Sequence, residues 1–248
     1  MQHRFIRLSV AAFLLAPLVA QDDGWMSIDQ LNEDKEFDAA YAQLSEMSAV
    51  HANDVAYLWR MARHHFTVSD NSDVTGVISQ NVYAGLDFAR LALAADSSSA
   101  DANGYFGILI GRAGEIEGTK QKIVNSYEVA SHTLRAIELQ PADDAWQHVM
   151  GRWHFALADL SWLERTFASI AYATPPEATF EEAEIYFREA ARIDPEDIRH
   201  FLWLGKTRIE LDNPGGARSS LETAVALPAK SDSDRLLPDE ARELLGDL

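Results

Sequence analysis

The chain has 248 residues, and its 39 acidic residues against 21 Lys and Arg give a formal net charge of −18. This acidic surplus excludes bulk binding of nucleic acid and nonspecific attraction to anionic membranes, because both depend on many basic groups that neutralise phosphate. The chain contains no cysteine, which excludes disulfide bonds and a cysteine-linked lipid anchor, so the fold must be stabilised by ordinary core burial.

The first twenty residues differ in composition from the rest of the chain. Residues 1–7 contain two arginines and no acid, and residues 8–20 are apolar apart from Ser9. A basic start, a short apolar run and a small final residue are typical of a secretory signal peptide. The run is also shorter than the ~20 residues that span a bilayer. We therefore expect residues 1–20 to be removed and 21–248 to form a single exported, periplasmic or secreted domain without a transmembrane segment. An uncleaved amphipathic start is the alternative.

From residue 28 onward, apolar residues recur every three or four positions, which predicts helices rather than strands. The tetratricopeptide repeat is a pair of helices, A and B, in ~34 residues. Its B helix carries a small residue where it crosses helix A, a bulky residue four positions later and a second small residue three further on. Five segments fit this spacing in whole or in part: Ala40/Leu44/Met47, Ala84/Phe88/Leu91, Val129/Thr133/Ala136, Ala183/Phe187/Ala190 and Ala217/Leu221/Ala224.

Each A helix also needs a small residue at the crossing, and the candidates are Ala62, Gly111, Gly151 and Gly205. In the last unit the interval to the B helix is the ideal one, whereas the three earlier units exceed it by about 10, 6 and 20 residues. We therefore predict an all-α, tetratricopeptide-like solenoid of four to five helical hairpins with long insertions between helices A and B. The final segment, Pro238–Leu248, is predicted to be a capping helix. A helical bundle without repeats is the alternative.

A basic residue follows the small crossing residue in four units; these residues, called the basic ladder below, are Arg63, Arg112, Arg152 and Lys206. In a tetratricopeptide unit this position faces the concave groove. The same alignment places His148, Phe155 and Arg199 on that face. Arginine binds carboxylate and phosphate through a planar fork, so the ladder predicts a site for an anionic ligand. The alternative is that each basic residue pairs with an acid from a neighbouring repeat.

The sequence offers little sign of catalysis or of a metal site. It contains no G-x-S-x-G nucleophile motif, and residues 114–120 resemble a phosphate-binding loop only superficially, because the glycine spacing is wrong. The eight histidines lack the spacing of metal ligands: His64 and His65 are adjacent, and His148 and His154 are six positions apart. We therefore expect no enzyme activity, no catalytic residue, no metal and no cofactor.

Several motifs, spread over residues 55–245, resemble the regulator of microtubule dynamics family. They are Leu58–Arg63, Glu117–Ile123, Gly151–Trp153, Asp159–Arg165, Thr174–Thr179 and Leu204–Lys206. The resemblance implies a tetratricopeptide-like solenoid and a non-enzymatic interaction protein associated with microtubules, and some members of the family are linked to membranes and lipid handling. The central stretch, which includes the longest insertion, is specific, and its motif residues are Trp153, Trp162, Glu164 and Arg165.

Two functions remain open at this point. The first is a binding module outside the cytoplasm that holds a peptide, a protein partner or another anionic ligand in the groove. The second is a carrier for a lipid, an anionic lipid included, or for an apolar small molecule, with the insertion at 160–180 as its lid. A deep, closed, apolar cavity would favour the carrier, and an open polar groove would favour the binding module.

Overall fold

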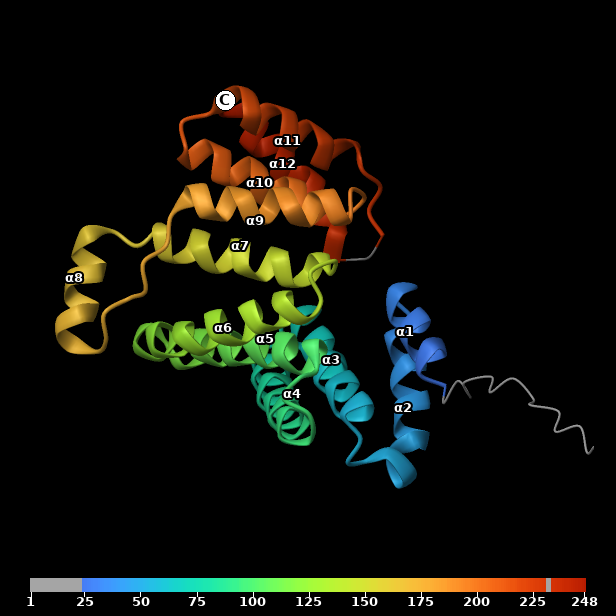
Figure 1. Cartoon of the computed structure of the whole chain (residues 1–248). Coiled ribbons are helices and arrows are strands. Elements are labelled where there is room, and N and C mark those ends of the chain that lie inside the picture. Colours follow the sequence, from blue (N-terminus) through green and yellow to red (C-terminus); the bar gives the residue numbers. More distant parts are fainter. Residues whose placement is uncertain (1–23, 231–232) are drawn as a thin grey trace, which may run out of the picture.

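A computed structural model describes residues 24–230 and 233–248, and every regular element in these residues is helical (Figure 1). The elements are α1 (Trp25–Glu33), α2 (Phe37–His51), α3 (Val55–Asp70), α4 (Thr75–Ala95), α5 (Ala100–Glu117), α6 (Thr119–Leu139), α7 (Asp144–Ala158), α8 (Trp162–Ala171), α9 (Phe180–Ile193), α10 (Ile198–Glu210), α11 (Pro214–Ala226), η1 (Ser233–Leu236) and α12 (Leu237–Gly246). The predicted all-α class is confirmed.

The helices stack as antiparallel hairpins, one after another along the chain. The pairs are α1–α2, α3–α4, α5–α6, α7–α9 and α10–α11, and each pair also contacts the next. Helix α12 packs against α11 at the end of the stack, where Ala241 joins Leu221 and Ala224 in one buried cluster. The predicted solenoid of four to five hairpins is therefore confirmed, with five pairs in the described residues, and so is its C-terminal capping helix.

The B-helix spacing marks the buried face of four units. The predicted residues of α9 and α11 are fully buried, as are Ala40 and Leu44 on α2, and those of α6 are buried. The prediction for α4 was wrong by one position, because Leu91 is exposed and the buried residues with the predicted spacing are Gly85, Ala89 and Ala92. Gly85 lets α4 approach α3 and α5 closely, since a Cβ there would lie 3.0 Å from atoms of both His65 and Leu109.

Glycines at the predicted crossings have no room for a side chain. A Cβ on Gly151 would lie 2.6 Å from the ring of Phe187, and a Cβ on Gly205 would lie 2.5 Å from Leu221. In the third unit the tightest approaches lie on either side of the predicted Gly111: a Cβ on Gly107 would lie 2.7 Å from Thr133, and one on Gly114 would lie 2.9 Å from the backbone of α6. The glycines therefore set how closely helix A approaches helix B.

The predicted insertions take two forms. In the second and third units they lengthen the hairpin, so that α4 and α6 reach 21 residues each. In the fourth unit the insertion forms α8, which projects to one side of the α7–α9 pair (Figure 1). Ser161 and Glu164 form a reciprocal capping box at the start of α8, which satisfies free backbone N–H groups of its first turn.

Stability should fall on acidification because of His64, whose ring stacks on Tyr41 with a centroid distance of 4.2 Å. Burial, and then the neighbouring His65, lower the pKa of His64 to about 4, against an opposing effect of Asp38. The folded state disfavours the charged ring, so stability falls as pH drops from about 6.5 towards about 4. Between about pH 7 and about pH 5, the free energy of unfolding should fall by ~1 kcal/mol less in His64→Phe than in the unaltered chain. Urea unfolding at the two pH values measures this difference. Equal losses in both proteins would contradict this assignment.

Candidate functional site

The basic ladder lies on the A helices α3, α5, α7 and α10, and three of its four members are paired with acids. Arg63 Nη2 lies 2.7 Å from Asp29 Oδ1 on α1. Arg112 Nη1 lies 3.1 Å from Glu115 Oε2 one turn later, and its Nη2 lies 3.9 Å from an oxygen of Asp70. Lys206 pairs with Glu240 on the capping helix. These three residues therefore link neighbouring elements.

Arg152 differs from the rest of the ladder, because no acid among the described residues binds it. Its guanidinium lies over the ring of Trp203, 4.0 Å from the ring centroid, and the side chain is exposed to solvent. The surrounding protein lowers the pKa of this guanidinium by desolvation, and the nearby charges of Arg112 and Arg199 lower it further, against Glu115 and Asp70. Arg152 is thus a cation without an acidic partner, close to two others.

Trp203 is the aromatic centre of this region. The ammonium group of Lys206 lies 4.4 Å from its centroid, on the same helix, and Arg152 reaches it from α7. The predicted Phe155 packs edge-on against the same indole, with ring centroids 5.2 Å apart. Cations over tryptophan are attracted by the ring's electron density. The ring therefore holds two ladder side chains beside each other across two repeats.

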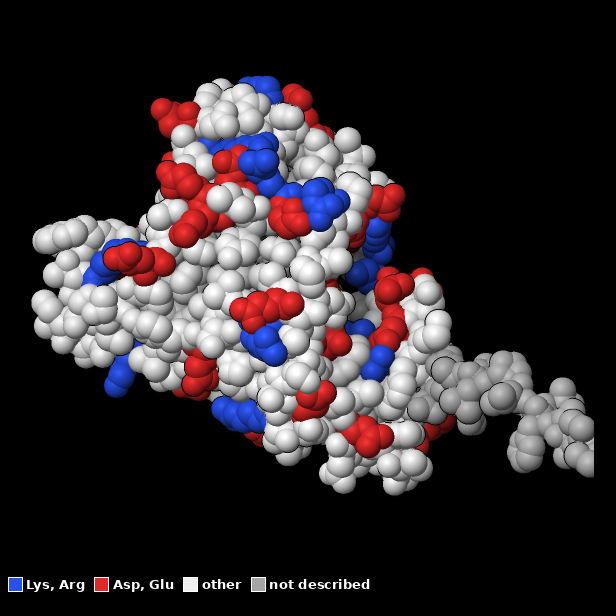
Figure 2. Space-filling view, viewed as in Figure 1, with Lys and Arg blue, Asp and Glu red and all other residues white. Residues whose placement is uncertain are grey.

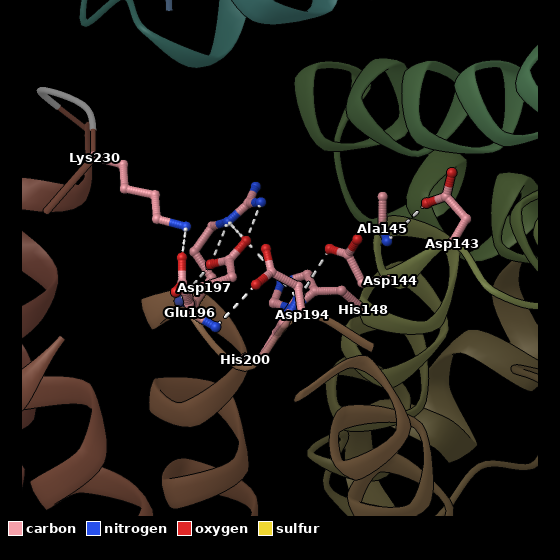
Figure 3. A network of polar contacts seen from close by, with 10 residues as sticks. Asp143, Asp144, Ala145, His148, Asp194, Glu196, Asp197, His200 and Lys230 are labelled. Carbon is pink, nitrogen blue, oxygen red and sulfur yellow. Dashed lines mark hydrogen bonds and ion pairs between the residues drawn. The ribbon is translucent and has the colours of Figure 1, made fainter. Parts of the chain in front are cut away.

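His148 is buried and was wrongly placed in the groove. Its Nδ1 lies 2.9 Å from Nδ1 of His200, and Nε2 of His200 lies 3.0 Å from Asp144 Oδ2 (Figure 3). Burial, with the nearby His200 as the next cause, holds the pKa of His148 well below its usual value. The contact with His200 shows that this side chain of α7 faces α10 instead of solvent. The pair of rings therefore connects two A helices inside the stack.

The predicted Arg199 is exposed and binds an acid on its own helix. Its Nε lies 3.0 and 2.9 Å from the two carboxylate oxygens of Asp197, the N-cap residue of α10. This contact lowers the pKa of the Asp197 carboxyl despite its burial. The charge of Arg199 also lowers the pKa of Arg152, as the smallest of several causes.

The same network contains three groups that could contact a metal ion. Oxygens of Asp144 and Asp197 and Nε2 of His200 lie within 4.8 Å of one another. However, Asp197 is bound by the Arg199 guanidinium, and His200 already bonds to Asp144 and His148. A cation would have to displace these contacts beside a positive arginine. The three groups are better explained as a polar link between α7 and α10.

Basic and acidic side chains are interspersed over the visible surface (Figure 2). The view also shows a hollow between α1 and the C-terminal helices, with Lys and Arg atoms as well as Asp and Glu atoms at its walls. A second hollow, of about 550 Å³, lies between α7 and α9 and is open to solvent; it is lined by Gln147, Ile185, Tyr186, Arg188, Glu189 and Arg192. Because this hollow is open, it is not the deep, closed cavity that a carrier would need.

The insertion motif is structural for three of its four residues. Trp153 donates its indole N–H to the carbonyl of Ser126 at 2.8 Å, and Glu164 caps α8. Arg165 donates to the carbonyls of Leu157 and Pro176. Trp162 is exposed. The expected lid over residues 160–180 is not formed, because α8 makes no extensive contact with any other described helix and stands to one side of the stack (Figure 1).

Sequence reasoning missed the partners of the ladder: Asp29, Trp203 and Glu240. The position of Trp203, one turn before Lys206, was a usable local signal, because residues three apart lie on the same helical face. The acids gave no such signal, since Asp29 lies 34 positions before Arg63.

Residues 26–248 match the family described as "Regulator of microtubule dynamics protein 1-3". The chain belongs to this family. It is 36% identical over 222 residues to Regulator of microtubule dynamics protein 1 of Bos taurus, and the match covers 88% of this chain and 68% of that protein. The protein of the same name from Caenorhabditis elegans is 29% identical over 225 residues, covering 90% and 98%. The resemblance inferred from the motifs is confirmed.

Among solved structures, the fold is similar to that of a thermophilic TPR protein of Thermus thermophilus. The TM-score is 0.63 at 14% sequence identity, and the match covers 91% of this chain and 99% of that one. At this identity the likeness shows the fold alone. It confirms that the regulator of microtubule dynamics fold of this chain is a tetratricopeptide-like solenoid.

The expectation of an exported, periplasmic or secreted protein was wrong. The family is named for the regulation of microtubule dynamics, and microtubules lie inside cells. A basic start followed by an apolar run shows only that this segment is locally hydrophobic, and this pattern alone does not determine where in or outside the cell a protein is located. Residues 1–20, and the predicted cleavage after them, lie outside the described residues. Within 24–230 and 233–248, no helix combines the length and the apolar character needed to cross a bilayer.

Proposed function

We propose that this chain is a non-enzymatic scaffold that binds a short acidic segment of a protein partner on the inner face formed by α3, α5, α7 and α10. Residues 21–248 would act as one repeat domain. Arg152 is the anchoring cation, and the observation that carries the proposal is that no acid among the described residues binds it. A carboxylate of the partner would take that position.

The surroundings of Arg152 favour a carboxylate ligand. Glu115 and Asp70 raise the pKa of Arg152 while Arg112 and Arg199 lower it, so charges of both signs lie near this guanidinium, but no described carboxylate forms an ion pair with it. The guanidinium carbon lies 4.0 Å from the centroid of the Trp203 ring, and a guanidinium has five N–H groups that can donate to a carboxylate. Hydrogen bonds that involve a charged group contribute ~1.5–3 kcal/mol. One well-placed carboxylate therefore suffices for a contact that determines affinity.

Overall charge limits the partner to a short segment. The chain carries a net charge of −18, so a broad acidic surface would be repelled at long range. Repulsion between exposed charges is screened beyond ~10 Å at ordinary salt, whereas contacts at Arg152 act at close range. A narrow acidic peptide can reach the inner face without bringing a large acidic surface close to the outer helices.

A non-enzymatic role agrees with the hydrogen bonding of the clustered polar side chains, which are already bonded within the protein. Asp144, Asp197 and His200 lie closest together, but they bond to their neighbours, and His200 is fully buried. An enzyme site needs convergent polar groups that a substrate can reach. This cluster instead connects two repeats.

Arg152→Gln tests the proposed function. We expect the variant to bind a fluorescein-labelled oligoglutamate peptide about tenfold or more weakly than the unaltered chain, because it loses a charge-assisted contact. Fluorescence anisotropy measures the affinity, and raising the salt concentration should weaken binding by the unaltered chain. An oligoglutamine peptide should not bind.

Arg135→Gln is the matched control. Arg135 is an exposed arginine on the B helix α6, where it pairs with Glu138 one turn later, so the variant has the same change in charge away from the inner face. Its affinity for oligoglutamate should stay within about twofold of the unaltered chain. Equal weakening by both variants would show a nonspecific charge effect, and no weakening by Arg152→Gln would refute the site.

A further inference from the structure

Helix α8 exposes an apolar face that a surface helix normally buries. Trp162 is 75% exposed and Ile170 is 82% exposed, and Leu163 and Phe167 are 70% and 61% exposed. At ~100° per residue these four side chains lie within ~140° of the helix circumference. Large apolar residues gathered on one exposed face indicate an interaction site, whereas single ones scattered over a surface do not.

Hydrogen bonds on the opposite side of α8 hold this apolar face towards solvent. Arg165, on the opposite side of α8, donates to the carbonyl of Leu157 at 2.6 Å and to that of Pro176 at 3.3 Å. Ala168 is the buried residue of the helix. The hydroxyl of Tyr127 on α6 also binds the carbonyl of Thr174, which follows α8. Rolling the apolar face inward would break these contacts.

The exposed face carries no charge. Glu164 bonds to Ser161 in the capping box, and Arg165 faces the body of the protein. The part of the surface that α8 occupies in Figure 1 is largely white in Figure 2. An uncharged face on a chain of net charge −18 complements an uncharged surface, and an anionic surface would repel the chain. Zwitterionic lipid headgroups fit this requirement.

The face is too small for a stable dimer. Large aromatic side chains offer ~150–250 Å² each, so the four exposed side chains present on the order of 500 Å². A stable protein interface needs ~800 Å² on each partner. A bilayer has no such threshold, because a short apolar helix can insert its side chains one by one among the headgroups. A second copy of the chain is therefore the weaker occupant.

We propose that α8 is a membrane-docking helix that lies flat in the surface of a zwitterionic bilayer. The helix has 10 residues, far short of a bilayer span, so it would lie in the interface. Trp162 at its start and Tyr172 just after its end are the residue types enriched at the headgroup level. Because α8 projects from the solenoid, it can reach a flat surface while the repeats stay in solvent (Figure 1).

Flotation of the full chain with phosphatidylcholine vesicles tests this proposal. The unaltered chain should float with the vesicles, and high salt should not release it, because the contact is apolar. Leu163→Glu/Ile170→Glu should lower the partition coefficient by ~30-fold or more, since two charges enter the inserted face. Both positions are exposed, so the melting temperature should stay close to that of the unaltered chain.

The matched control is Val50→Glu/Ile185→Glu, which adds the same two charges at exposed apolar positions of α2 and α9 and should float like the unaltered chain. In addition, acyl-chain-brominated phosphatidylcholine should quench the fluorescence of the unaltered chain more than that of Trp162→Phe. The proposal is overturned if the unaltered chain binds only anionic vesicles, or if Trp162→Phe changes no quenching. It is also overturned if the α8 double variant only dissociates a dimer.

Discussion

Asp29→Ala should lower the free energy of unfolding by ~3 kcal/mol, the cost of leaving a buried charge without its partner. Both Arg60 and Arg63 on α3 bind this carboxylate, and Arg60 Nε lies 2.9 Å from Asp29 Oδ1. Arg60 is buried, and its guanidinium carbon lies 4.9 Å from the ring centroid of Trp25 and 4.0 Å from that of Trp59. Urea unfolding followed by circular dichroism measures the loss.

Asp87→Ala is the control for this prediction. Asp87 pairs with Arg90 one turn later on the exposed side of α4, so its removal changes the net charge equally. Exposed pairs contribute ~0–1 kcal/mol, so this variant should unfold like the unaltered chain. If Asp29→Ala were no more destabilising than Asp87→Ala, the contact between α1 and α3 would not be a buried ion pair. Hydrogen exchange should also become faster in α1 of Asp29→Ala, because this aspartate holds α1 to the next repeat.

Leucine at either crossing glycine should destabilise the fold by ~1–3 kcal/mol through overpacking. The change is Gly151→Leu or Gly205→Leu, and in each case the first side-chain atom would already lie inside contact distance of Phe187 or Leu221. Both neighbours are fully buried, so they have little freedom to move away. Thermal unfolding measures the effect. The destabilisation by overpacking should exceed the stabilisation of up to ~1 kcal/mol that results from replacing a glycine within a helix.

Gly76→Ala provides the comparison, since a Cβ at this position of α4 would meet nothing within 4 Å. It should leave stability unchanged or raise it by up to ~1 kcal/mol, because alanine favours the helix. Leucine variants at Gly151 and Gly205 that melt at the temperature of the unaltered chain would show that the A and B helices do not cross there.

Much of the fold depends on which side chains of each helix are buried, and the sequence predicted most of these buried faces. The spacing of Ala183, Phe187 and Ala190 reports the periodicity of a single helix, so it identified the buried face of α9 without knowledge of its partner. Gly151 and Gly205 were readable for the same reason, since glycine within a helix indicates a close approach. In α4 the same reasoning failed, because Ala84 has the bulky Phe88 four positions later and so fits the pattern, whereas the buried Gly85 is followed at that spacing by the small Ala89.

The candidate site depends on contacts between helices, and only the tertiary structure decided it. The sequence by itself determined that a basic residue follows each crossing residue. It did not determine that Arg63 binds Asp29, or that Arg152 lies over Trp203, because these partners come from other repeats. The bond between His148 and His200 joins residues 52 positions apart, which turned an expected groove residue into a buried one. Helical periodicity describes one helix, whereas the pairing of charges depends on how separate helices are stacked.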